Sequence, residues 1–268
     1  MEILTFLLWP FLACLLLVLI HAWFGIHILE RGIIFVDLAL AQFIGIGIAL
    51  NLLLGREGSY LLPLLFAFTG ALILATARRL TGLVNIEAFI GVLYIFSLST
   101  SILILDKAPH GLEEFKTIMN GNILWVTPHD LASTAVVYGI VGLVHFLLRK
   151  KFHALSFTGE GGLWLELLFF GSFAVVLVKS VQLAGILQVF SFLVIPALIG
   201  RLFRREPYQV LMVGWLAGTL VSLAGTGLSF VLDIPTAPVI VAGLALMFFS
   251  LLTMKFVRKW VHGRENRG

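Results

Sequence analysis

Long apolar runs of near-constant length, separated by short polar joints, constrain this chain more than any other feature. The runs lie at about 3–28, 33–54, 60–77, 86–105, 130–148, 163–179, 182–200, 210–232 and 237–256. An α-helix of roughly 20 residues spans the ~30 Å hydrocarbon core of a bilayer. Inside that core no water satisfies the backbone, so a spanning segment must be a helix or a strand of a closed barrel, and runs of this length select helices. The sequence therefore predicts an all-α fold, a polytopic transmembrane helical bundle.

The composition excludes a water-soluble domain. Hydrophobic residues make up 60% of the chain and charged residues 12%, and the mean hydropathy is +1.08. A soluble fold has too little polar surface at this composition. We expect one transmembrane domain over residues 1–268, with eight or nine spans, because the sixth and seventh runs are close enough to form one span and a broken helix.

Three further features narrow the class. The first residues lack the basic segment and small-residue cleavage site of a signal peptide, so the first run is expected to be a retained span. The lone Cys14 excludes an intrachain disulfide framework and a cysteine-rich metal site. The basic pI of 9.4 could suggest nucleic acid, but the cations lie at helix ends, so no nucleic-acid partner is expected.

The positions of the cations predict the orientation. Fourteen of the 18 Lys and Arg residues fall in joints that would share one side of the membrane, and four fall on the other. Cytoplasmic joints carry the excess of Lys and Arg in membrane proteins. We therefore expect the N-terminus outside and the C-terminus in the cytoplasm.

Asp37 is the clearest candidate for function. An ionisable residue inside a span costs several kcal/mol and usually marks a path for an ion or a proton. Ala41, Gly45 and Ala49 follow it at four-residue intervals, so Asp37 lies on a small-residue face that packs against other helices. The alternative is that Asp37, near the end of its span, caps a neighbouring helix.

Two histidines precede Asp37 on the first apolar run. If the two helices are antiparallel, His27 lies within about 3 Å of the depth of Asp37, and His21 lies about 6 Å deeper. Imidazole and carboxylate groups are ligands that suit zinc and manganese. The three side chains are therefore candidate metal ligands along a path, although a histidine near a helix end is more often an interfacial polar residue.

A second cluster lies in the long joint 106–122, expected outside the membrane. Its acidic residues and histidine could attract a divalent cation at an outer entry: Asp106, His110, Glu113 and Glu114. Apolar residues at helical spacing within the joint predict a short amphipathic helix. This helix could lie on the membrane surface, receive a partner or serve as a solvated connector.

Motifs of soluble enzymes are missing from the sequence. There is no GxxxxGK[ST] phosphate loop, no HExxH metalloprotease helix and no GxSxG elbow. The chain is therefore not expected to be an enzyme, and any energy source must come from another subunit or from an ion gradient.

Three segments resemble the ABC-3 family of zinc, manganese and iron permeases. They are RGIIFVDLALAQ at 31–42, KAPHG at 107–111 followed by NGNILWV at 120–126, and LAGIL at 183–187 followed by FLVIPA at 192–197 with Arg201. Together with the order of the spans, the resemblance covers nearly the whole chain.

The resemblance implies a multi-pass permease of a bacterial inner membrane. Such a permease forms a homodimer, receives metal from an extracytoplasmic binding protein and is driven by a separate ABC ATPase subunit that binds ATP. No permanently bound cofactor is implied, only the transported divalent ion. Asp37 aligns with the intramembrane aspartate that the family places in the metal path.

The chain departs from the family at two places. Many members carry a histidine four residues after the aspartate, where this chain has Ala41, so the choice between zinc and manganese is open. The cytoplasmic joint 153–162 lacks the acidic-Ala-Gly helix that docks on the ATPase and is several residues short. Coupling then uses a reduced contact or another joint, such as 201–209.

A metal importer permease working by alternating access is the leading interpretation. A secondary transporter driven by a proton or sodium gradient is the first alternative, with Asp37 as the proton carrier, but no convincing inverted repeat supports it. The second alternative is a membrane scaffold without transport activity, in which the buried polar residues only fix helix packing.

Overall fold

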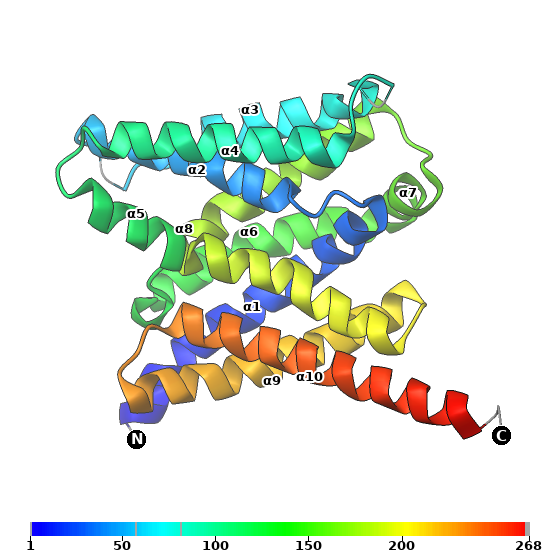
Figure 1. The fold of residues 1–268 in the computed structure, drawn as a ribbon. Helices are drawn as coiled ribbons and strands as arrows, with labels where there is room; N and C mark the ends of the chain where they lie inside the picture. Colours follow the sequence, from blue (N-terminus) through cyan, green and yellow to red (C-terminus); the bar gives the residue numbers. More distant parts are fainter. Residues whose placement is uncertain (1, 57, 81, 266–268) are drawn as a thin grey trace.

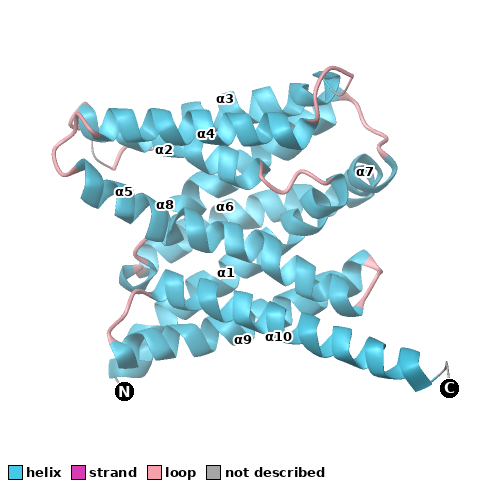
Figure 2. Ribbon diagram, in the orientation of Figure 1, coloured by secondary structure: helices cyan, strands magenta, loops and turns pink. Residues whose placement is uncertain are grey.

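The computed structural model describes residues 2–56, 58–80 and 82–265, and it consists of helices joined by short loops (Figures 1 and 2). The α-helices are α1 (Glu2–Arg31), α2 (Val36–Leu53), α3 (Leu61–Ala77), α4 (Ile86–Leu105), α5 (Gly111–Asn120), α6 (Pro128–Leu147), α7 (Arg149–His153), α8 (Leu163–Phe203), α9 (Pro207–Leu232) and α10 (Thr236–Glu265). Short 3₁₀ helices cover Arg78–Leu80 and Ile123–Trp125, and a π-helical turn covers Ala154–Thr158. No strand occurs in these ranges, which confirms the all-α prediction.

Seven of the described helices are long and apolar enough to cross a membrane, namely α1, α2, α4, α6, α8, α9 and α10. The apolar helix α3 is shorter, at 17 residues. The amphipathic helix expected in the joint 106–122 is present as α5. The helical-bundle prediction is therefore confirmed.

Helix α8 is 41 residues long but does not run straight. At 1.5 Å per residue, a straight helix of this length would extend about 60 Å. Near its two ends, however, Glu166 pairs with Arg31, and Arg201 pairs with Glu30, so both ends meet the same end of α1. The helix breaks at Gly185, where φ is 74° and ψ is 165°, and its two halves run in opposite directions (Figure 1).

The break at Gly185 is formed against the end of α5. A Cβ atom on Gly185 would lie 2.2 Å from the backbone nitrogen of Gly121, and a Cβ on Gly121 would lie 2.1 Å from the carbonyl carbon of Ala184. Gly121 also has a positive φ of 65°. Only glycine combines this backbone conformation with so close an approach of two main chains.

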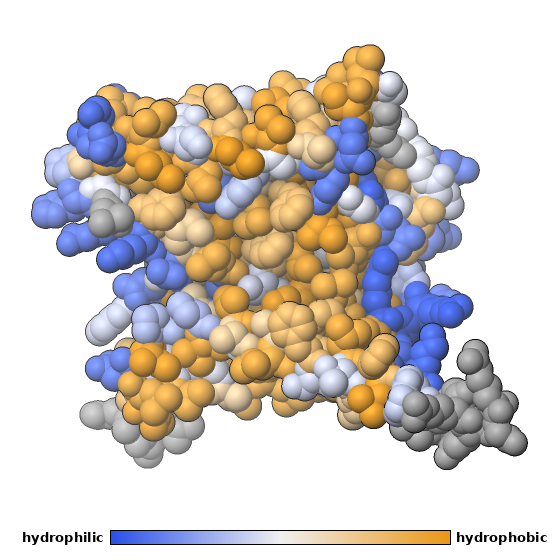
Figure 3. Space-filling model, in the orientation of Figure 1, coloured by the Kyte–Doolittle hydropathy of each residue, from blue (hydrophilic) through white to orange (hydrophobic). Residues whose placement is uncertain are grey.

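The helices form a buried centre and an apolar periphery. Helix α1 packs against α8 and α9, α2 packs between α3 and α4, and α8 also contacts α3, α9 and α10. Helices α1, α2 and α8 are mostly buried, whereas most residues of α4, α6 and α10 are at least partly exposed. Figure 3 shows that the surface between the polar margins of the molecule is largely apolar, as a lipid-facing bundle requires.

One end of the bundle collects cations. Here α1 ends, α8 both begins and ends, and α7 and the start of α9 line a common pocket. We call it the basic end, and its described cations include Arg31, Arg149, Lys150, Lys151 and Arg201. Helix α5 and the joint between α2 and α3 lie together at the opposite end.

Candidate functional site

Asp37 lies in the first turn of α2 and is fully buried. Neither of its carboxylate oxygens has a hydrogen-bond partner within the described part of the chain. The N-terminus of a helix favours a negative charge, which offsets part of the cost of burying this carboxylate. The rest of the free-energy cost of burial is not offset by any hydrogen bond in the described chain. A cation or a proton at Asp37 would offset it.

The small-residue stripe below Asp37 packs as predicted. Ala41, Gly45 and Ala49 are all buried. A Cβ on Gly45 would lie 3.4 Å from the Oγ atom of Ser101 on α4, an ordinary contact distance, so the stripe packs against α4. Asp37 therefore shares its helix face with a packed seam of the bundle.

His21 lies deep in α1 with no exposed surface. Its Nδ1 is 2.9 Å from the carbonyl oxygen of Leu17, an acceptor, so the ring proton resides on Nδ1. Its Nε2 then carries a lone pair and has no hydrogen-bond partner in the described residues. A neutral imidazole nitrogen of this kind is able to bind a metal ion.

His27 faces a different neighbourhood, the π-helical turn after α7. Its Nδ1 is 3.0 Å from the Oγ of Ser156, and its ring contacts Trp23, Phe157 and Phe169. The contacts of His27 with this turn and with α8 account for its burial. Its neighbours are therefore aromatic rings and a hydroxyl group rather than carboxylates.

The three predicted path residues do not form one ligand set. Across the described ranges, no group of three His, Cys, Asp or Glu side chains is placed to hold a metal ion. Asp37 lies on α2, and no hydrogen-bond partner of its carboxylate is found in the described residues, whereas His27 contacts α8 and the π-helical turn. Their shared role in a path stays a prediction.

The predicted outer cluster is dispersed over the start of α5. His110 and Glu113 approach each other at 3.5 Å, and Asp106 pairs with Lys107 at 3.0 Å, all strongly exposed. Glu114 instead lines a cavity of about 370 Å³ at this end, together with Asn51, Ser59, Tyr60, Thr117 and Gln182. Of the four residues, Glu114 is the one placed at a polar cavity.

Sequence reasoning missed a partly buried hydrogen-bond chain through the buried side chain of His145 on α6. The indole Nε1 of Trp23 can only donate, so Nδ1 of His145 accepts its hydrogen bond, at 3.1 Å. The proton then lies on Nε2 of His145, which is 2.8 Å from the Oγ of Ser172. The signal in the sequence was a histidine within an apolar run, but its partners are distant along the chain.

A second missed feature is a polar patch beside the break in α8. The Nε2 atom of Gln188 donates to the Sγ of Cys14 at 3.3 Å, and Gln188 is fully buried. Its Oε1 and the Oγ1 of Thr226 on α9 have no hydrogen-bond partner in the described chain. Like the Asp37 oxygens and the Nε2 of His21, these oxygens carry lone pairs and are buried without a hydrogen-bond partner in the described chain.

The sequence matches a known family over almost its entire length. The model of the ABC 3 transport family matches residues 3–255. A probable metal transport system membrane protein of Chlamydia pneumoniae is 27% identical over 248 residues, which cover 86% of this chain and 83% of that protein. The manganese transport system membrane protein MntB of Synechocystis sp. is 27% identical over 169 residues, 60% of this chain and 55% of that protein.

A solved structure shares the fold. A chain of PsaBC from Streptococcus pneumoniae in complex with Fab superposes with a TM-score of 0.74 at 20% identity, covering 92% of this chain and 90% of that chain. The family match spans the segments that contain Asp37, α5 and the broken helix α8. The chain, a multi-pass membrane permease, therefore belongs to the ABC 3 transport family.

Proposed function

We propose that this chain is the membrane-spanning subunit of an ABC importer for a divalent metal ion, manganese or zinc. Family membership supports the transport role, and the similarity to a manganese transport protein of Synechocystis supports manganese as one candidate. The permease moves the ion by alternating access in a bacterial inner membrane.

The observation that carries the proposal is the buried, unpartnered carboxylate of Asp37. A divalent cation would neutralise this group and recover the cost of its burial. The site is weak and transient, because an ion bound by many ligands would not be released. His21 and Gln188 offer further nitrogen and oxygen atoms, and His27 is the third predicted path residue.

The proposed topology has nine spans. The break at Gly185 makes α8 two antiparallel spans, and α3 is counted as a short span. The basic end faces the cytoplasm, since Lys and Arg are enriched there. This arrangement places the N-terminus outside and the C-terminus inside.

A separate ATPase subunit supplies the energy, because the sequence has no phosphate-binding loop. Its proposed contact surface comprises α7, the π-helical turn and the start of α8. Exposed side chains on this surface include Lys151, Glu160 and Trp164. The turn is anchored to α1 through His27 and Ser156, so movement of the turn reaches the helix that holds His21.

Two further partners are proposed, an extracytoplasmic metal-binding protein and a second copy of this chain. An extracytoplasmic metal-binding protein would dock at the end that holds α5 and the Glu114 cavity. A second copy of this chain would complete the path, because one copy gathers no metal ligand set in the part described.

Metal uptake into proteoliposomes tests the proposal. The vesicles contain the permease with its candidate ATPase and binding protein, and uptake of manganese, zinc and iron is compared with and without ATP. Asp37→Asn removes the charge and should abolish ATP-dependent uptake while the protein remains folded. Asp233→Asn is the matched control, because this exposed residue at the end of α9 has a positive φ that Asn also tolerates.

The outcome separates the alternatives. Uptake that follows an imposed proton gradient without ATP would replace the importer with a secondary transporter. If Asp37→Asn transports normally when folded, Asp37 serves packing and the metal path lies elsewhere.

A further inference from the structure

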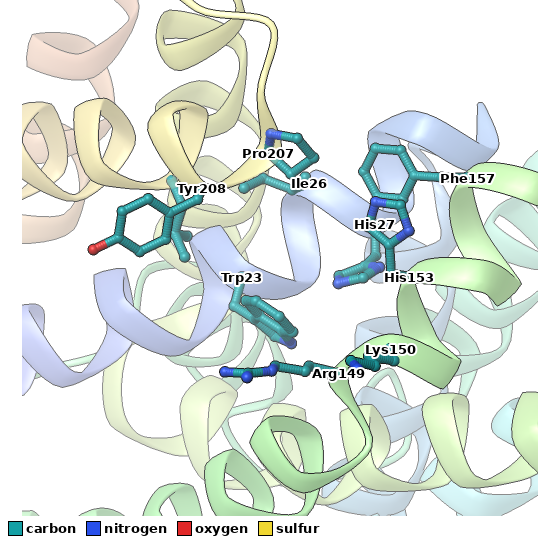
Figure 4. Close-up of a pocket in the computed structure, with 10 residues that line it drawn as sticks. Trp23, Ile26, His27, Arg149, Lys150, His153, Phe157, Pro207 and Tyr208 are labelled. Atoms are coloured by element: carbon teal, nitrogen blue, oxygen red, sulfur yellow. The ribbon is translucent and has the colours of Figure 1, made fainter.

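A pocket at the basic end is lined by cations and by rings (Figure 4). It has a volume of about 390 Å³ and lies among α1, α7, the π-helical turn and the start of α9. Figure 4 shows Trp23 between Tyr208 on one side and His27 with His153 on the other, with Arg149 and Lys150 along the floor of the view. No acidic side chain is among its lining residues, so the pocket is suited to an anion.

The pocket continues into an apolar groove between α1, α6 and α9. The groove has a volume of about 580 Å³ and shares Trp23, Arg149, Tyr208 and Leu211 with the pocket. Its other lining residues are mostly apolar and include Ala135, Gly139, Gly142, His145 and Phe146 on α6. One continuous surface therefore combines a cationic mouth with an apolar interior.

The length of the groove matches one leaflet of a bilayer. Its lining runs along α6 from Ala135 to Arg149, which corresponds to about 21 Å at the helical rise. One leaflet, with its headgroup region, is about 20–22 Å thick. The mouth thus lies at headgroup depth when the far end lies near the middle of the membrane.

The side chains that form the walls of the groove are held in place by contacts within the protein. The polar atoms of Trp23 and His145 bond to each other and to Ser172, which leaves their rings as apolar wall. The guanidinium of Arg149 lies 4.8 Å from the centre of the Phe146 ring at the mouth. On α6, a Cβ added to Gly139 or Gly142 would meet no atom within 4 Å, so the groove is open along this face.

We infer that this surface binds an anionic phospholipid, with its phosphate at Arg149 and Lys150 and an acyl chain in the groove beside Gly139 and Gly142. Basic pockets between transmembrane helices on the cytoplasmic side bind acidic lipid headgroups. The charge of the mouth selects the headgroup, and the apolar groove selects a lipid over a free anion. This inference does not depend on which metal is transported.

Native mass spectrometry of the full chain in detergent tests the inference. The probes are phosphatidylglycerol and phosphatidylcholine with the same acyl chains, and inorganic phosphate as competitor. Each cation near an anionic lipid is worth roughly a fivefold factor in affinity, so Arg149→Gln with Lys150→Gln should weaken phosphatidylglycerol binding about 25-fold. Binding of phosphatidylcholine should change little.

Matched variants control for charge and for folding. Arg204→Gln with Arg205→Gln removes two exposed cations from the same end outside the pocket and should leave lipid binding unchanged. Gly142→Leu fills the groove and should weaken both lipids. Gly227→Leu adds the same side chain at another open glycine, on α9, and should weaken neither.

Three results would overturn the inference. The first is equal retention of phosphatidylglycerol by wild type and by the Arg149 and Lys150 double variant. The second is displacement of the lipid by inorganic phosphate at comparable concentration, which would indicate a simple anion site. The third is loss of a dimer in Gly142→Leu without a change in lipid binding, which would assign the groove to a second copy of the chain.

Discussion

The backbones of Gly121 and Gly185 meet more closely than any side chain permits, and both residues have positive φ. We predict that Gly121→Ala lowers stability by about 2–4 kcal/mol, because the new Cβ strains the backbone and collides with Ala184. Thermal unfolding in detergent measures the loss. Gly91→Ala, at an open helical position, is the control and should melt with the wild type; equal melting of the Gly121 variant would refute the close contact.

The hydrogen bond between Trp23 and His145 makes a double-mutant prediction. His145→Phe keeps a ring against Phe152, stacked at 4.2 Å in the wild type, but leaves the partly buried Trp23 N–H without its acceptor. The expected loss is about 1–3 kcal/mol. Adding Trp23→Phe removes the N–H group that lost its acceptor. The stability loss of the double variant should therefore be smaller than the sum of the losses of the two single variants. Strict additivity in the melting experiment would contradict this network.

Two ion pairs hold the two ends of α8 to the end of α1, and they differ in burial. The side chains of Arg31 and Glu166 are 10% and 4% exposed, whereas those of Arg201 and Glu30 are 37% and 33% exposed. Glu166→Gln should therefore cost about 3–5 kcal/mol. Glu30→Gln should cost about 0–1 kcal/mol. Melting curves of the two variants in the same detergent compare them, and a larger loss for Glu30→Gln would show that the exposed pair is the stronger anchor.

The helical type of the fold could be predicted from the sequence, but the break in α8 could not. Two apolar runs, 163–179 and 182–200, left open whether α8 is one span or two. The reversal occurs at Gly185, which has a positive φ and lies against Gly121, about 60 residues away in the sequence. Hydropathy and periodicity reflect only local sequence, so they cannot predict a contact between residues far apart in the chain.

The candidate site was predictable in part for a similar reason. The small-residue stripe correctly placed Asp37 on a buried face. Depth along antiparallel helices suggested that His27 lies near Asp37, but depth does not fix the direction in which each side chain points. His27 contacts Ser156 and α8 instead, and those partners become neighbours only when the distant helices pack.

At the scale of the whole molecule, the pairing of both ends of α8 with α1 predicts the membrane topology. Cysteines introduced at Glu160 and Arg204, before and after α8, should lie on the same side of the membrane. A cysteine at Lys116 on α5 should lie on the other side. All three positions are exposed, and the native Cys14 is fully buried, so labelling reports on the new cysteines in a Cys14→Ser background.

A membrane-impermeant maleimide applied to intact cells should label Lys116→Cys, because α5 lies at the end that we assign to the outside. Glu160→Cys and Arg204→Cys should react only after the membrane is permeabilised, because the basic end faces the cytoplasm. Labelling of Glu160→Cys and Arg204→Cys from opposite sides would mean that α8 crosses the membrane once, which reduces the count to eight spans. If the sides are simply exchanged, the nine-span path stands and the orientation reverses, which would place the proposed ATPase contact at the end that holds α5.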